Sequence, residues 1–157
     1  MTDSPERLAE RLASEGQKTI DFFSNLPDPL WFMTIYEEGT LWQVRQILAH
    51  LVSAEAANRQ LIQAIMVGSP GAPLDFNIDI FNEKEVKSLA SQPNQELIDQ
   101  FKRLRQETIE FVLSLKTDDL QKQGRHPFFG VAALEDIIKL IYRHGQIHVR
   151  DIRKLTG

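Results

Sequence analysis

The sequence predicts an all-α protein that folds as a four-helix bundle. Three observations support this fold class. Apolar residues recur at helical spacing in four long segments, clusters of proline and glycine separate these segments, and no alternation typical of β-strands is seen. A chain of 157 residues has the size of one domain with one hydrophobic core, so we expect a single domain over residues 1–157.

The first helix is expected over residues 4–26, although a polar stretch around Gly16 weakens its middle. It ends before Pro27 and Pro29, because a proline disfavours helix at the residue before it. Residues 29–39 follow. Their apolar side chains fit either a short helix or a packed connector, and periodicity does not decide between the two.

The second helix is expected to begin near Thr40, because Thr40 and Gln43 have the spacing of a capping box. Its apolar residues recur at i, i+3, i+4 and i+7 as far as Ile65, and the Gly/Pro-rich residues 68–73 end it. Residues 74–91 then form a long crossover between the second and third helices. The last part of this crossover fits a short helix.

The third helix follows Pro93 and is expected over residues 94–115, and the fourth is expected over residues 131–155. The inward-facing stripe of the fourth helix has spacings of three and four residues. It consists of Leu134, Ile137, Ile141, His144, His148, Ile152 and Leu155.

Three histidines occupy predicted core positions. His144 and His148 share one helix face because they are four residues apart, and His50 points inward from the second helix. Two such imidazoles and a third from a facing helix can hold one metal ion and leave coordination positions open. The alternative is three ordinary buried histidines. However, three unpaired polar rings would cost ~1–3 kcal/mol each, so the pattern favours metal binding.

Other polar residues near these helices have two interpretations each. His126 precedes Pro127 in a predicted loop, where we expect it to be exposed or packed within the loop. Four further side chains lie close in sequence to the histidines and fit either acceptors for an imidazole N–H or solvated helix residues. They are Glu55, Asn58, Asp136 and Asp151.

Three segments carry recognisable motifs. LWQVRQILAHLVSAE contains W-x-V-x-x-I-L-x-H-L, FNIDIFNEKEV has an aspartate ahead of F-N, and HPFFGVAALEDIIKLIYRHGQIHVRDI ends in a predicted helix with H-x-x-x-H. In this order, and over nearly the whole chain, they resemble the DinB/YfiT-like superfamily, whose central segment has the pattern D-x-x-x-F-N. The resemblance implies an up-down-down-up bundle, often a dimer. It also implies a divalent metal, zinc or nickel, bound by His50, His144 and His148.

The resemblance further implies a metal-dependent enzyme of the thiol S-transferase type acting on a small-molecule substrate. The chain has no cysteine, so the thiol would come from a low-molecular-weight cofactor. A metal-dependent hydrolase and a non-enzymatic, stress-associated metal- or small-molecule-binding protein remain open as alternatives. Polar side chains that fit either the pocket of such an enzyme or ordinary surface roles are Asn77, Asp79, Asn82, Arg125, Arg143 and Arg150.

Charge and hydropathy limit the partners. The chain carries 18 basic and 22 acidic residues, a net charge of −4, so we expect no nucleic-acid partner. No apolar run reaches the ~18 residues of a membrane span, and the polar N-terminus is unlike a signal peptide. We therefore expect no membrane partner and a cytoplasmic location. Residues 29–39 and the HPFFG segment carry surplus apolar area, which together with the resemblance predicts a homodimer.

Overall fold

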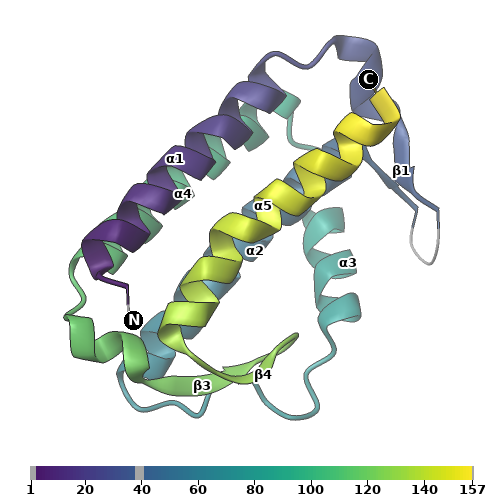
Figure 1. Ribbon diagram of the computed structural model, residues 1–157. Coiled ribbons are helices and arrows are strands. Elements are labelled where there is room, and N and C mark those ends of the chain that lie inside the picture. The colour runs from purple at the N-terminus through teal and green to yellow at the C-terminus, as the bar shows by residue number, and fades with distance from the viewer. Residues whose placement is uncertain (1–2, 38–40, 157) are drawn as a thin grey trace.

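The computed structural model describes residues 3–37 and 41–156, and within them the chain forms four long α-helices and one short one. These are α1 (Pro5–Ser24), α2 (Val44–Met66), α3 (Ile78–Ser88), α4 (Asn94–Leu113) and α5 (Leu134–Thr156). Helices α1 and α5 run in one direction and α2 and α4 in the other (Figure 1). The predicted up-down-down-up four-helix bundle is confirmed.

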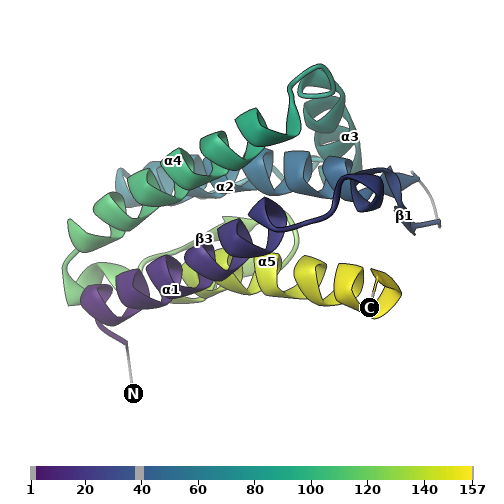
Figure 2. The ribbon, with the colours of Figure 1, turned by 90° about the horizontal axis from the view of Figure 1, so that it is seen from above.

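The long helices form two layers, with α2 and α4 in one and α1 and α5 in the other (Figure 2). Across the two layers α1 packs against α4 and α2 against α5, and within the layers α2 contacts α4 and α1 contacts α5. Because α2 and α4 are parallel, the chain must travel back along the bundle between them, and the crossover with α3 does this. Among the described residues no helix is both long enough and apolar enough to cross a membrane.

Helix α1 runs through Gly16 without a break, so the weak middle expected from the sequence is not seen. Its start is fixed by Ser4, whose hydroxyl accepts the backbone N–H of Arg7 at 3.1 Å. A Cβ atom at residue 16 would lie 2.9 Å from Cγ of Arg105 on α4. The glycine therefore makes room for a buried arginine rather than ending the helix.

Helix α2 begins at Val44, later than expected. The backbone N–H of Gln43 donates to Oε1 of Gln46 at 2.7 Å, so the capping interaction lies three residues beyond the predicted one. Thr40 itself lies outside the described residues. Of the connector predicted at residues 29–39, the described part to residue 37 combines a 3-10 helix (Asp28–Phe32) with strand β1 (Thr34–Tyr36), so both a short helix and a packed segment are present.

The structure also contains two short antiparallel hairpins, although the sequence shows no β alternation there. Strand β1 pairs with β2 (Trp42–Gln43), and β3 (Gln123–His126) pairs with β4 (Gly130–Ala133). Strands of two to four residues are too short to show an alternating pattern. Strand β4 also takes residues 131–133 from the predicted fourth helix, so α5 starts at Leu134. Gly130 has a φ of 77°, which suits the turn before β4.

The hydrophobic core consists of two clusters along the bundle. The cluster nearer the β1–β2 hairpin includes Trp31 and Ile35, so part of the connector covers that end of the bundle. The apolar residues of the stripe predicted for α5 are buried as far as Ile152, His144 and His148 within it are half-buried, and Leu155 is 53% exposed.

A buried ion pair connects all four long helices. Arg105 of α4 donates from Nε and Nη2 to the two carboxylate oxygens of Glu55 on α2, both at 2.9 Å. The same guanidinium donates to the backbone oxygens of Leu12 on α1, at 3.0 Å, and Ile141 on α5, at 3.5 Å. Of the two roles that fit Glu55 in the sequence, acceptor for an imidazole and solvated helix residue, the structure has neither, because both carboxylate oxygens bind Arg105.

Candidate metal centre

The three predicted histidines meet between α2 and α5. Nε2 of His144 lies 3.0 Å from Nε2 of His50 and 2.9 Å from Nε2 of His148. One ligand atom from each of the three rings lies within 4.8 Å of the others. His50 is only 6% exposed, whereas His144 and His148 are half-buried. The cluster is thus anchored in the core on one side and accessible on the other.

The hydrogen bonding of the cluster fits a cation better than it fits three neutral rings alone. His144 Nε2 can carry one proton, yet it faces two other ring nitrogens. Nδ1 of His50 is buried without a hydrogen-bond partner among the described residues, and an ion on Nε2 would leave that nitrogen unpaired, so only the Nε2 atoms favour a cation. Nitrogen ligands lie ~2.0–2.1 Å from zinc, so ligands of one ion stand roughly 3–4 Å apart. The three nitrogens are close to that spacing.

Burial keeps these rings neutral. It lowers the pKa of His50 to about 3 and that of His148 to about 4, and it places the pKa of His144 well below its ordinary value. A nearby ring also lowers the pKa of His50, whereas Asp151 opposes the shift at His148. Neutral imidazole is the form that binds a metal, so the cluster is ready to coordinate at neutral pH.

Tyr36 of β1 and Asp151 of α5 extend the cluster behind His148. The Tyr36 hydroxyl lies 2.8 Å from Nδ1 of His148 and donates to Oδ2 of Asp151 at 2.6 Å. Burial and the bond to Asp151 raise the pKa of Tyr36, so its hydroxyl keeps its proton. One interpretation of Asp151 from the sequence is an acceptor for an imidazole N–H. In the structure the carboxylate contacts His148 indirectly, through the hydroxyl of Tyr36, which the sequence places only in the connector. The strand pairing that brings Tyr36 here left no signal in the sequence.

His126 lies outside the cluster, and its expected loop is strand β3. It is 5% exposed. Its Nε2 lies 3.0 Å from Oδ1 of Asn58, and its Nδ1 accepts the backbone N–H groups of Phe128 and Phe129 at 3.0 and 3.4 Å. The ring therefore holds the β3–β4 turn against α2. One of the two roles predicted for Asn58, acceptor of an imidazole N–H, is thus seen, but the imidazole belongs to His126 and not to one of the three clustered histidines.

The remaining polar candidates are distributed over the surface. Asp136 is exposed, and the side chain of Asn77 accepts the backbone N–H of Ile80 as the N-cap of α3. Arg143 places its guanidinium 5.9 Å from the centre of the Tyr142 ring, and Arg125 donates to a backbone oxygen. Arg150 is exposed, and its charge lowers the pKa of Tyr36. None of these three arginines contacts the histidine cluster among the interactions of the described residues.

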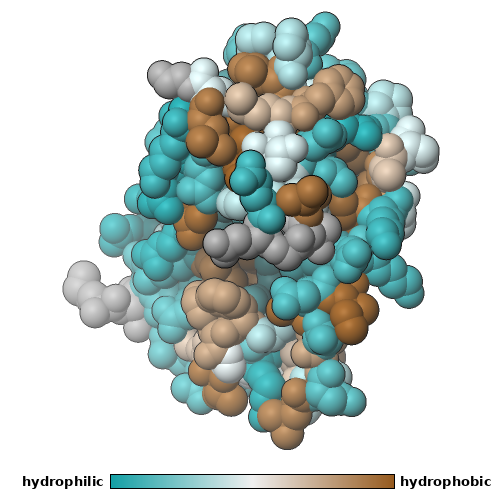
Figure 3. Space-filling view, turned by 90° about the vertical axis from the view of Figure 1, so that its right-hand side faces the viewer, coloured by the Kyte–Doolittle hydropathy of each residue, from teal (hydrophilic) through white to brown (hydrophobic). Residues whose placement is uncertain are grey.

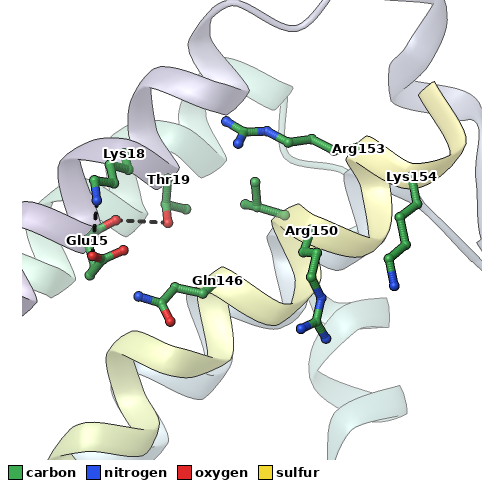
Figure 4. Close-up of a pocket in the computed structure, with 8 residues that line it drawn as sticks. Glu15, Lys18, Thr19, Gln146, Arg150, Arg153 and Lys154 are labelled. Carbon is green, nitrogen blue, oxygen red and sulfur yellow. Dashed lines mark hydrogen bonds and ion pairs between the residues drawn. The ribbon is translucent and has the colours of Figure 1, made fainter. Parts of the chain in front are cut away.

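The surface has a groove beside α5 and a mixed face formed by β1 and α3. A groove of about 520 Å³ lies between α1 and α5, where Gln146 and Arg153 extend toward α1 (Figure 4). His144 and His148 lie on the other side of α5, against α2, so the groove is not the entrance to the cluster. On the face formed by β1 and α3, hydrophobic residues are interspersed with hydrophilic ones (Figure 3).

Comparisons with known proteins agree with this architecture. A sequence profile of the DinB superfamily matches residues 4–152. A search of curated proteins found no match. YfiT from Bacillus subtilis, described as a probable metal-dependent hydrolase with an unusual four-helix bundle topology, superposes with a TM-score of 0.79. The two share 16% identity over 97% of this chain and 85% of YfiT.

Two further solved structures are similar at comparable identity. The colibactin self-resistance protein ClbS, in complex with dsDNA, has a TM-score of 0.78 and 13% identity over 99% of this chain and 96% of ClbS. The mycothiol-dependent maleylpyruvate isomerase has a TM-score of 0.75 and 11% identity over 96% of this chain and 61% of the isomerase. Likeness at these identities shows a common fold, whereas function depends on the individual site.

Proposed function

We propose that this chain, which belongs to the DinB superfamily, is a metal-dependent enzyme of the thiol S-transferase type. His50, His144 and His148 would hold one divalent ion, zinc or nickel. The observation that carries the proposal is the meeting of three Nε2 atoms in a cluster whose outer two rings are half-buried. Three protein ligands with an accessible side are typical of catalytic sites, whereas structural sites are closed by four.

The proposed reaction joins a small thiol to an electrophile. A divalent ion in this position supplies Lewis acidity that favours the deprotonated form of a thiol. The thiol sulfur forms a bond to an electrophilic carbon, the leaving group departs with the electron pair of its bond, and the thiol proton passes to solvent. The chain has no cysteine, so the thiol is a separate small molecule. The similar structure described as mycothiol-dependent supports a thiol co-substrate.

An arginine for an anionic tail of the thiol does not follow from the positions of the three candidates. Arg150 is exposed but lines the groove between α1 and α5, on the side of α5 away from the histidines. Arg143 places its guanidinium over Tyr142, and Arg125 donates to a backbone oxygen.

A metal-dependent hydrolase is the second candidate, supported by the description of YfiT. Hydrolysis needs a group that accepts a proton from water, and a carboxylate is a common choice. The two acidic side chains beside the histidine-bearing turns, Glu55 and Asp151, already bind Arg105 and Tyr36. Because both carboxylates already have hydrogen-bond partners, neither is free to accept a proton from water, and this favours thiol transfer over hydrolysis.

The test is an activity assay on protein loaded with Zn²⁺ or Ni²⁺. We expect the loaded protein to accelerate conjugation of cysteine to 1-chloro-2,4-dinitrobenzene, with loss of that acceleration in His144→Gln. Tyr142→Phe is the matched control, because Tyr142 lies on the same helix without touching the cluster. Acceleration of p-nitrophenyl acetate hydrolysis alone would assign the hydrolase. Metal binding without either activity would assign the non-enzymatic binding protein.

Nucleic acid is not among the partners we propose. ClbS was solved with dsDNA, but DNA binding relies on many cationic phosphate contacts, and this chain has a net charge of −4. We expect no change in fluorescence anisotropy of a labelled 20-base-pair duplex at 50 mM salt and micromolar protein. Saturable binding that weakens with salt would contradict the expectation. The cytoplasmic location stays a prediction.

A further inference from the structure

We propose that Tyr36 and Asp151 are positioning residues that fix both the orientation and the tautomer of His148. Only the predicted effect on metal affinity rests on the proposed function. The tautomer itself follows from the hydrogen bonds of the protein alone. The two residues come from different elements, β1 and α5, and both are half-buried.

The direction of each hydrogen bond follows from the chemistry of the carboxylate. An ionised carboxylate only accepts hydrogen bonds, so the single hydroxyl proton of Tyr36 points to Oδ2 of Asp151, at 2.6 Å. The tyrosine oxygen then acts as an acceptor toward Nδ1 of His148, at 2.8 Å. In a neutral ring this places the only ring proton on Nδ1. Nε2 is left as a bare lone pair that points at the other two histidines.

His148 differs in this respect from the other two rings of the cluster. Within the described residues, Nδ1 of His50 has no hydrogen-bond partner and the hydrogen bonds of His144 all involve Nε2. The tether to Tyr36 spans 112 positions of sequence, so it links the β1–β2 hairpin to the proposed site. The ring edge of Tyr36 also packs on His148, with centres 5.8 Å apart. Strand β1 thus supplies both a hydrogen bond and a ring contact that orient the half-buried ring of His148.

Nuclear magnetic resonance of the metal-free protein tests the tautomer directly, through the nitrogen shifts and couplings of each histidine ring. We expect His148 to be protonated at Nδ1 in the wild type. His126 is an internal reference, because its Nδ1 accepts two backbone N–H groups and its proton must lie on Nε2. Tyr36→Phe and Asp151→Asn should both mix the His148 tautomers and leave His126 unchanged. Tyr142→Phe is the matched tyrosine control and should change neither ring.

Metal competition with a chromophoric chelator tests the consequence. Loss of a partner that orients a metal ligand typically weakens affinity by about 10–100-fold, and we expect this for Zn²⁺ in Tyr36→Phe, with circular dichroism showing an unchanged fold. His148 protonated at Nε2 in the wild type, or no change in tautomer and affinity in both variants, would overturn the inference. If the wild type has the expected tautomer but binds no metal, the positioning role stands and the proposed function fails. If Tyr36→Phe keeps the wild-type tautomer and binds metal as tightly as the wild type, the positioning role fails and the proposed metal site stands.

Discussion

The buried ion pair between Arg105 and Glu55 gives a sharp prediction about stability. Replacing Arg105 with methionine removes the partner of a carboxylate whose side chain is only 3% exposed. Replacing Glu55 with leucine leaves a guanidinium that is 5% exposed without its carboxylate. Each single change should therefore destabilise the bundle strongly, whereas the double change removes both charges and should destabilise it far less.

The magnitude follows from this burial. Removal of one partner of a buried pair costs about 3–5 kcal/mol, and solvent screening reduces this little at such low exposure. For a chain of this size 1 kcal/mol shifts the melting temperature by about 2–4 °C, so each single variant should melt roughly 6–20 °C lower. The exposed pair Lys87–Glu83, with side chains 76% and 46% exposed, is the matched control. Glu83→Gln should change the free energy of unfolding by less than about 1 kcal/mol.

Urea unfolding followed by circular dichroism measures all five proteins and gives the coupling energy of the pair as a double-mutant cycle. We expect Arg105→Met/Glu55→Leu to be more stable than either single variant. A double variant as destabilised as the sum of the singles would refute the reasoning. So would single variants that unfold like the Glu83→Gln control.

Three further predictions concern metal, pH and association. Removing the metal should lower the melting temperature without unfolding the chain, because zinc at 100 times its Kd adds about 2.7 kcal/mol to the free energy of unfolding by linkage. A melting temperature that does not change with chelator would argue against the site. The unfolded chain binds more protons than the folded one below pH 6.5, where His50 (pKa about 3) and His148 (pKa about 4) are still neutral in the fold. The metal-free protein should therefore lose up to ~1.4 kcal/mol per pH unit per histidine as the pH falls from 6.5 to 4, and equal urea midpoints at pH 7.5 and 5.5 would contradict this. Phe32, Phe128 and Phe129 stay exposed, so we still expect a homodimer, and light scattering at micromolar concentration that gives 18.0 kDa would exclude one.

The sequence predicted the bundle and the meeting of the histidines because both depend on helical periodicity. Hydrophobic spacing identified the inward faces of α2 and α5, and the same spacing placed His50, His144 and His148 on those faces. The structure adds that the three Nε2 atoms face one another. Whether they bind a metal remains a prediction.

The parts that the sequence did not predict depend on contacts between distant segments. Tyr36 reaches His148 through a strand of three residues, which is too short to give a pattern. Nothing in the sequence singles out Arg105, because its carboxylate partner is 50 positions away and the glycine that makes room for it lies on a third helix. His126 looked like a loop residue because Pro127 follows it, yet its bonds to Asn58 and to the turn bury it.

The central claim is that His50, His144 and His148 together bind one divalent ion. Elemental analysis of protein purified without chelator or a nickel column, followed by calorimetric titration of metal-free protein with Zn²⁺ and Ni²⁺, tests it most directly. We predict one ion per chain in the wild type and a large loss of affinity in His144→Gln, with Tyr142→Phe unchanged. No stoichiometric metal in the purified protein and no uptake of either ion would contradict the claim, as would equal binding by the wild type and His144→Gln.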